Sequence, residues 1–312
     1  MPDGAAEPDS PILGVSLKLL SILSFVGMQT AIKATGESVP AGEVVFFRCF
    51  FALAPVLAYL AWLGDLRTAF STADLKGHAI RGLIGVSAMG LGFFSITRLP
   101  YPEWITINYA TPLITVVFAA LFLGEAVRAY RWTAVAIGLV GVGVVTIPNL
   151  SVGPGALSGP EGIGIIAAIV SSIFAAIAMI QVRKLTKTEK TATIVLYFML
   201  AATVISLLSV PFGWVVPTLS QAVLLVVAGI LGGIGQLLLT AAYRFADTST
   251  IAPFEYSSLI LAILIGSLLF GEVIEVSTLL GGGIVVMAGI FIIWRESRLG
   301  LERRRDRRAG TP

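Results

Sequence analysis

The chain has 312 residues, of which 56% are hydrophobic and 12% charged, with a formal net charge of +3 and a mean hydropathy of +0.93. Soluble domains are about one quarter charged, and a soluble core stops growing before it can absorb this much apolar chain. The composition therefore excludes a soluble globular protein and indicates an integral membrane protein.

Ten continuous apolar runs follow one another along the chain. A helix that crosses about 30 Å of hydrocarbon needs about 20 mostly apolar residues, whereas the strands of a membrane barrel would alternate over about ten. We therefore predict an all-α membrane protein with ten transmembrane helices. The predicted spans are 13–34, 43–63, 79–97, 103–123, 131–148, 162–181, 191–211, 220–242, 249–270 and 276–294.

Lys and Arg residues fall mainly on one side of this ten-span arrangement. If the N-terminus is inside, the outer flanks hold only Lys33 and Arg98, with Arg48 inside a span. Cytoplasmic loops carry the excess of positive charge, so both termini are expected in the cytoplasm and the protein in a bacterial inner membrane. The acidic N-terminal residues lack the features of a secretory signal and indicate an uncleaved tail.

The arginine-rich C-terminal tail, Arg303 to Arg308, is typical of a stop-transfer signal that contacts anionic lipid headgroups. It predicts membrane lipids as partners and no nucleic acid. A homodimer is left open.

The sequence contains few residues or motifs that could support catalysis or metal binding. Cys49 is the single cysteine and His78 the single histidine. His78 lies close in sequence to Lys76 and Arg81, and this basic stretch is expected to be a solvated loop. No disulfide within the chain and no cysteine cluster for a metal can form. The chain has no GxSxG, HExxH or Walker motif, so no enzyme, cofactor or metal is predicted.

Two stretches of the chain resemble each other, Arg98–Glu125 and Arg244–Glu272. Aligned on their final Gly-Glu, they place Tyr109 opposite Tyr256 and Asn108 opposite Glu255. Extending the alignment places Ser21 opposite Ser171 and Lys33 opposite Arg183. The pattern predicts two repeats of five spans, residues 1–150 and 151–312.

Five is an odd number, so the second repeat would enter the membrane upside down. Inverted repeats of this kind recur in secondary transporters, because two such halves can exchange conformations and open a central site to either side in turn. The pattern therefore favours a transporter.

Polar groups inside membrane spans are costly and are functional candidates by default. In the fourth span Pro112 cannot donate to the Asn108 carbonyl, which groups Asn108, Tyr109 and Thr111 into one polar patch. In the ninth span Pro253 has the same effect before Glu255, Tyr256, Ser257 and Ser258. We expect these residues to form the substrate site.

Glu255 is the sharpest single candidate, because an ionisable group within a span can carry a proton during transport. A partner such as Arg48 or Lys33 would instead keep it ionised and silent. Arg48 itself is expected to be structural. Weaker cavity candidates are Gln29, Gln181 and Gln236.

Two further features are predicted to be structural. Trp104, at the start of the fourth span, fits the aromatic belt at a membrane surface. Gly229 and Gly233 of the eighth span have the spacing at which helices approach closely.

The residues Asn108-Tyr-Ala-Thr-Pro-Leu113, Phe122-Leu-Gly-Glu125, and Gly138-Leu-Val-Gly141 resemble the EamA repeat of the drug/metabolite transporter superfamily. The second half resembles it through Leu269-Phe-Gly-Glu272 and Ala288-Gly-Ile290. The resemblance covers essentially the whole chain. It implies an inner-membrane carrier of small metabolites, with a cavity lined largely by spans one, three, four, six, eight and nine.

Members of this superfamily include amino-acid exporters and uptake systems for S-adenosylmethionine or riboflavin. The stretch Glu43–Arg48 and the turn Leu99–Trp104 are similar to the latter type. We therefore expect alternating-access transport of amino acids or their derivatives, with riboflavin or S-adenosylmethionine uptake as the alternative. A passive channel or a membrane sensor is the alternative of a different class.

Overall fold

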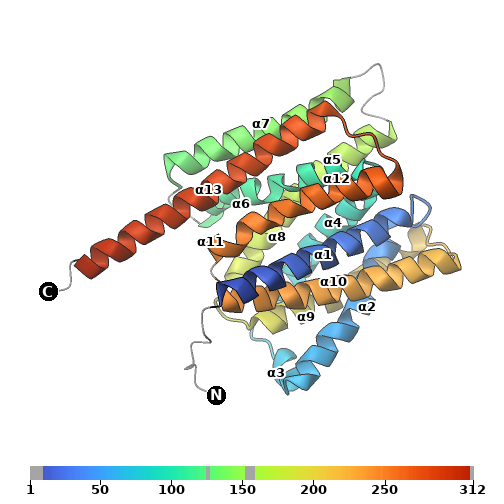
Figure 1. Ribbon diagram of the computed structural model, residues 1–312. Helices are drawn as coiled ribbons and strands as arrows, with labels where there is room; N and C mark the ends of the chain where they lie inside the picture. The colour runs from blue at the N-terminus through green and yellow to red at the C-terminus, as the bar shows by residue number, and fades with distance from the viewer. Residues whose placement is uncertain (1–9, 124–126, 152–158, 247, 310–312) are drawn as a thin grey trace.

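The computed structural model describes residues 10–123, 127–151, 159–246 and 248–309, and every regular element in these ranges is helical. Figure 1 shows the helices running roughly parallel in one bundle, with both termini toward the same end. We call this the terminal end and the opposite one the distal end. The helices are α1 (Pro11–Ala34), α2 (Ala41–Trp62), α3 (Leu66–Ala69), α4 (Leu75–Ile96), α5 (Tyr101–Asn108), α6 (Ala110–Leu123), α7 (Ala129–Ser151), α8 (Pro160–Leu185), α9 (Thr191–Ser206), η2 (Leu207–Phe212), α10 (Leu219–Phe245), α11 (Thr248–Ile251), η3 (Ala252–Tyr256), α12 (Ser257–Phe270) and α13 (Val276–Ala309).

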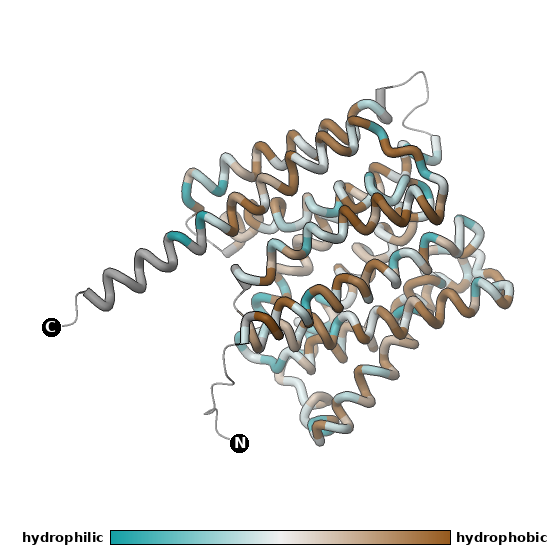
Figure 2. The backbone as a smooth tube through the Cα atoms, viewed as in Figure 1, coloured by the Kyte–Doolittle hydropathy of each residue, from teal (hydrophilic) through white to brown (hydrophobic). Residues whose placement is uncertain are grey.

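Ten helical segments of the described chain are long and apolar enough to cross a membrane. The predicted ten-helix fold is therefore confirmed, with span ends that differ from the prediction by a few residues. Large apolar side chains such as Val216, Leu268 and Met287 are exposed on the outside of the bundle. Figure 2 shows hydrophobic residues on the outward faces as well as between helices, as lipid contact requires.

The third span begins earlier than predicted, and this changes the position of His78. Asp74 caps α4, with its Oδ1 atom accepting from the Gly77 N–H at 2.8 Å. His78 is therefore helical and only 2% exposed, and its ring stacks on Tyr197 with centroids 4.6 Å apart. The prediction of a solvated loop was wrong, because the capping signal at Asp74 extends the helix beyond the apolar run.

Both spans that contain the predicted proline breaks are interrupted. The fourth span is divided at Tyr109 into α5 and α6, three residues before Pro112. The ninth consists of α11, the 3₁₀ turn η3 that contains Pro253, and α12. Because proline cannot donate a backbone hydrogen bond and its ring crowds the preceding turn, each interruption follows from the sequence.

The two repeats interlock through equivalent contacts. The first span of each packs along the third span of the other, α1 on α10 and α8 on α4. The aligned serines make the same bond in both places: Ser21 donates to the Gly235 carbonyl at 2.8 Å, and Ser171 to the Ala88 carbonyl at 2.7 Å. With five spans each, the repeats run in opposite directions through the bundle.

Small residues allow the closest helix approaches. A Cβ atom at Gly229 would lie 3.0 Å from the Phe47 carbonyl oxygen, and one at Gly233 would lie 2.8 Å from that of Ala52. These two glycines thus let α10 pack against the backbone of α2, as their spacing predicts. At another edge of the bundle α7 and α13 lie side by side, and α13 continues past the membrane span to Ala309 (Figure 1).

Candidate functional site

A cavity of about 500 Å³ lies between the two repeats, where the broken spans meet α1 and α13. Its wall is mostly apolar with a few polar groups, as is typical of small-molecule sites. The lining residues from the first repeat are Lys18, Ile22, Phe25, Val26, Gln29, Trp104, Ile105, Asn108, Tyr109, Pro112, Leu113 and Val116. Those from the second are Met179, Tyr243, Ala252, Glu255, Tyr256, Ser258, Gly289, Ile292 and Ile293.

Six of the residues predicted from the sequence line this cavity: Gln29, Asn108, Tyr109, Glu255, Tyr256 and Ser258. The break in the fourth span positions Asn108, whose Nδ2 donates to the Trp104 carbonyl at 2.8 Å. Gln29 is held from the side by Tyr101, whose hydroxyl donates to Oε1 at 2.9 Å. These amides are thus oriented by the scaffold before any ligand arrives.

Tyr109 and Tyr256, which the repeat alignment pairs, are also neighbours in space. Their rings meet edge to face with centroids 5.2 Å apart, a favourable geometry for aromatic pairs. The Tyr109 hydroxyl lies 2.6 Å from the Ser258 Oγ, and Ser258 also donates to the Glu255 carbonyl at 2.7 Å. The breaks of the two spans therefore touch each other beside the cavity.

Glu255 is ion-paired with Lys18, whose Nζ donates to the Oε2 atom of the carboxylate. Lys18 comes from α1 and Glu255 from η3, so the pair joins the two repeats. The Lys18 side chain is 5% exposed and that of Glu255 is 50% exposed. The partner is thus neither Arg48 nor Lys33, the two cations considered from the sequence.

Among the lining residues that were not predicted as part of the site are three whose side chains carry a polar group: Lys18, Trp104 and Tyr243. Trp104 is 5% exposed, and its Nε1 donates to the Gly92 carbonyl at 3.0 Å and to Ser95 Oγ at 2.9 Å. Its assignment to the aromatic belt was wrong, because α5 turns the ring inward. Lys18 lies two turns inside its span, and a charged residue at that depth could have been predicted as part of the site from the sequence.

The other four predicted residues lie elsewhere. Thr111 lines an adjoining cavity of about 380 Å³, which shares Pro112 with the main one. Gln236 lines a separate pocket of about 170 Å³ against α2 and α9. Ser257 donates to the Phe254 carbonyl, and neither it nor Gln181 lines the cavity.

The distal end of the bundle is closed over the cavity by contacts of Glu272. Its Oε1 lies 2.8 Å from Lys33 Nζ, and its Oε2 accepts from the Tyr101 N–H at 2.8 Å, at the first turn of α5. Lys33 also donates to the Leu99 carbonyl at 2.5 Å. We call Lys33, Glu272 and the Tyr101 N–H the distal latch.

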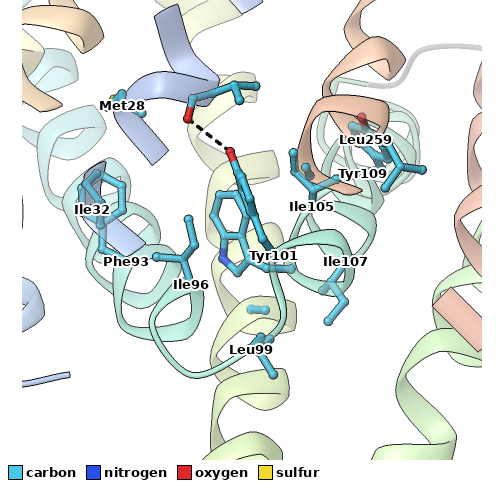
Figure 3. Close-up of a cluster of buried hydrophobic side chains, with 14 of the residues drawn as sticks. Met28, Ile32, Phe93, Ile96, Leu99, Tyr101, Ile105, Ile107, Tyr109 and Leu259 are labelled. Atoms are coloured by element: carbon cyan, nitrogen blue, oxygen red, sulfur yellow. Dashed lines mark hydrogen bonds between the residues drawn. The ribbon is translucent and has the colours of Figure 1, made fainter. Parts of the chain in front are cut away.

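The packing beneath the latch is dense. Figure 3 shows the side chain of Tyr101, the first residue of α5, extending toward α1, where its hydroxyl lies 3.3 Å from the Val26 carbonyl oxygen. Leu99 and Ile96 are fully buried beside it. The cavity is therefore separated from the distal surface by a packed layer. Glu125, the repeat equivalent of Glu272, lies outside the described residues.

Arg48 does not line the cavity. Its side chain is buried between α1 and α10, next to Met28 and Gly232, and its Nη1 contacts Cys49 Sγ at 3.7 Å. None of the ion pairs among the described residues includes it. The side chain therefore fills space inside the bundle.

A polar cluster at the terminal end joins the two repeats outside the spans. One oxygen of Glu189 accepts from the Thr72 hydroxyl at 2.8 Å and from the backbone N–H groups of Ala73 at 2.7 Å and Asp74 at 2.9 Å. His78 Nε2 lies 3.9 Å from the same oxygen. Hydrogen bonding, chiefly from Thr72, lowers the pKa of Glu189. No group of three or more potential metal ligands occurs within the described residues.

Comparison with known proteins places this geometry in context. A model of the EamA-like transporter family matches residues 12–147 and again 162–295, one match for each repeat. The chain is 27% identical over 286 residues to the S-adenosylmethionine uptake transporter of Rickettsia bellii (strain RML369-C), covering 92% of this chain and 95% of that protein. It is 29% identical over 282 residues to the pseudopaline exporter CntI of Pseudomonas aeruginosa (strain UCBPP-PA14), covering 89% and 94%.

One solved crystal structure has the same fold, with a TM-score of 0.64 and 20% sequence identity, covering 92% of this chain and 98% of the other. At this identity the likeness concerns the fold alone.

Proposed function

Because this chain belongs to the EamA-like transporter family, we propose that it is a secondary transporter that moves an amino acid or amino-acid derivative by alternating access. The cavity shared by the two repeats is the proposed substrate site. S-adenosylmethionine, itself an amino-acid derivative, is included because one similar protein carries that name. Riboflavin is the second candidate, because Trp104, Tyr109 and Tyr256 offer aromatic surface to a flat ring.

The observation that carries this proposal is the position of the two broken spans. Interrupted helices near the middle of the membrane are where inverted-repeat transporters hold their substrates. Here both interruptions border one cavity, through Tyr109 on one side and Tyr256 on the other. Two halves that meet at such a site can rock about it and expose it to each side in turn.

Counterflow in proteoliposomes tests the proposal. Vesicles containing the purified protein are loaded with unlabelled compound, and uptake of the labelled compound is followed for the amino acids, S-adenosylmethionine and riboflavin. We expect saturable counterflow of at least one compound of the amino-acid class. The similar proteins include an uptake transporter and an exporter, so flux is measured in both directions.

Absence of counterflow for every compound would reject the proposed function. Flux that does not saturate would instead support the passive channel, since a continuous pore needs no conformational cycle. Binding without flux would support a membrane sensor.

Proton coupling through Glu255 is a part of the proposal with its own test. A proton has to compete with Lys18 for the same carboxylate, so uptake of a proton requires the ion pair to open. We expect Glu255→Gln to abolish accumulation driven by a pH gradient while exchange continues. Unchanged accumulation would remove Glu255 from the coupling mechanism.

The orientation is also proposed, with both termini in the cytoplasm of a bacterial inner membrane. The cavity would then reach toward the cytoplasm, because Lys18, Tyr243 and Ile293 line it near the terminal ends of their membrane spans. Periplasmic and cytoplasmic reporter fusions at the C-terminus test this. Activity of the periplasmic reporter would reverse the assignment.

A further inference from the structure

The ion pair of Lys18 and Glu255 differs from the others in its location. Among the described residues, the ion pairs Lys33–Glu272 and Arg98–Glu37 lie at the distal end, and the contact of His78 with Glu189 lies at the terminal end. Only Lys18 and Glu255 both line the main cavity. The pair therefore places one positive and one negative charge side by side on the wall of the proposed substrate site.

The two partners are not held by other strong contacts. Within the described part of the chain, Lys18 Nζ has hydrogen-bond contact with Glu255 and with no other acceptor, although an ammonium has three donors. The Glu255 carboxylate likewise accepts from Lys18 alone among the described groups, and half of its side chain remains accessible. Each partner thus neutralises the other while leaving capacity for a ligand.

This arrangement determines which ligands can bind without a large electrostatic cost. A ligand with a single charge can replace only one partner, and the other charge is left uncompensated in a mostly apolar cavity. A ligand with both charges compensates each of them. The rest of the wall, with Phe25, Trp104 and Val116, is suited to the apolar part of such a ligand.

We propose that Lys18 and Glu255 are the specificity-determining residues, and that the substrate is a zwitterion whose carboxylate binds Lys18 while its cationic group binds Glu255. This rests on the proposed transport function and narrows its substrate class. In the empty carrier the two residues pair with each other. In the loaded carrier the substrate lies between them.

A series of ligands that share one side chain and differ in the charges of their amino and carboxyl groups tests the inference. Phenylalanine is a zwitterion, its methyl ester is a cation and N-acetylphenylalanine is an anion, and the same series is made from methionine. Each competes for counterflow in proteoliposomes containing the full-length chain, against whichever amino acid the wild-type protein exchanges. We expect the zwitterion to compete roughly tenfold or more better than either single-charge analogue.

Single substitutions should then change the preferred charge. Lys18→Met leaves an unpaired carboxylate and should make the ester the strongest competitor. Glu255→Gln leaves an unpaired ammonium and should favour the N-acetyl compound. The matched control, Glu37→Gln, removes a carboxylate that pairs with Arg98 at the distal end and should keep the wild-type order.

The outcomes separate the inference from the proposed function. If an amino acid shows counterflow, but the wild-type protein, Lys18→Met, Glu255→Gln and Glu37→Gln all rank the three competitors in the same order, the inference is overturned and the transport function remains intact. No counterflow of any compound by the wild-type protein would overturn both. If a variant fails to insert, its thermal unfolding profile in detergent shows this, and Lys18→Arg, which keeps the charge, should retain the wild-type order.

Discussion

Lys33 Nζ lies 2.8 Å from Glu272 Oε1, so a cation of the first repeat is held by the Gly-Glu that ends the ninth span. Both side chains are largely buried, at 9% and 14% exposure. Gly271 makes this possible, because its left-handed backbone (φ +64°) ends α12 and turns Glu272 back over Gly266, whose carbonyl accepts from the Glu272 N–H at 2.9 Å. The Gly271-Glu272 pair is thus a helix cap joined to an inter-repeat contact.

The distal latch should control access to the cavity from the distal side. In a Cys49→Ser background, Gln29→Cys places the only thiol on the cavity wall. Adding Glu272→Gln removes the ion pair, and we expect labelling by a membrane-impermeant maleimide from the distal side to become about tenfold faster, which corresponds to about 1.4 kcal/mol. The rate is measured in right-side-out vesicles.

Glu275→Gln is the matched control for the latch, because Glu275 lies three residues further on and bonds to the exposed Ser277. It should leave the labelling rate unchanged. Equal rates in the Glu272 and Glu275 variants would show that the latch does not limit access.

Tyr109 should contribute to substrate binding through its ring and its hydroxyl separately. Tyr109→Phe keeps the contact with the Tyr256 ring and loses the bond to Ser258, so we expect the apparent affinity in counterflow to fall by about two- to tenfold, as for one hydrogen bond. Tyr109→Ala should lower the apparent affinity further, because the aromatic contact with Tyr256 is also lost.

The control is Tyr197→Phe, which removes a hydroxyl that donates to the Phe70 carbonyl at 3.0 Å, away from the cavity. Its affinity should equal that of the wild type. An undiminished affinity in Tyr109→Ala would place the substrate elsewhere.

Substitution by alanine should destabilise the protein at Gly271 but not at Gly283. Gly271→Ala forces a side chain into the left-handed region and should lower the free energy of unfolding by about 1 kcal/mol. At Gly283, inside α13, an added Cβ atom would have no neighbour within 4 Å. Alanine there should leave the free energy of unfolding unchanged or raise it by up to about 1 kcal/mol. Unfolding by dodecyl sulfate in mixed micelles measures both. The opposite order of stability would contradict the assigned cap.

Glu189 should make the stability of the terminal end depend on pH. Its pKa in the folded protein is lowered from an ordinary value of 4.5, mainly by the Thr72 hydroxyl, so its stabilising contribution is complete above that value. The contribution should be lost as the pH falls from there through the lowered pKa. Thermal unfolding in detergent between pH 7 and pH 3 measures this, and Glu189→Gln should flatten the dependence below pH 4.5. A variant with the same profile as the wild type would exclude Glu189 as its source.

The number of spans and the breaks in two of them follow from local properties of the chain. About twenty apolar residues in succession enter a membrane as a helix whatever their neighbours are, and Pro112 and Pro253 remove backbone hydrogen bonds wherever they occur in a helix. The repeat alignment also anticipated a spatial pair, Tyr109 with Tyr256. The helix at His78 was missed, since the cap at Asp74 is polar and lies before the apolar run.

The membership of the site was predicted only in part. Polar residues beside both breaks line the main cavity, whereas Thr111, Ser257, Gln181 and Gln236 do not. Trp104 was missed because a tryptophan at a span end fits the membrane surface equally well. The direction in which a side chain points depends on helix rotation, which neighbouring helices decide.

The sequence by itself determined a ten-span transporter of two inverted repeats, because hydrophobicity, proline chemistry and internal similarity are properties of the chain alone. The tertiary structure decided which charges meet. Lys18 and Glu255 are separated by 237 positions and belong to different repeats, and Lys33 and Glu272 are separated by a similar length of chain. Such pairs form where packed helices bring side chains together in an environment that strengthens their attraction, and no local pattern records that.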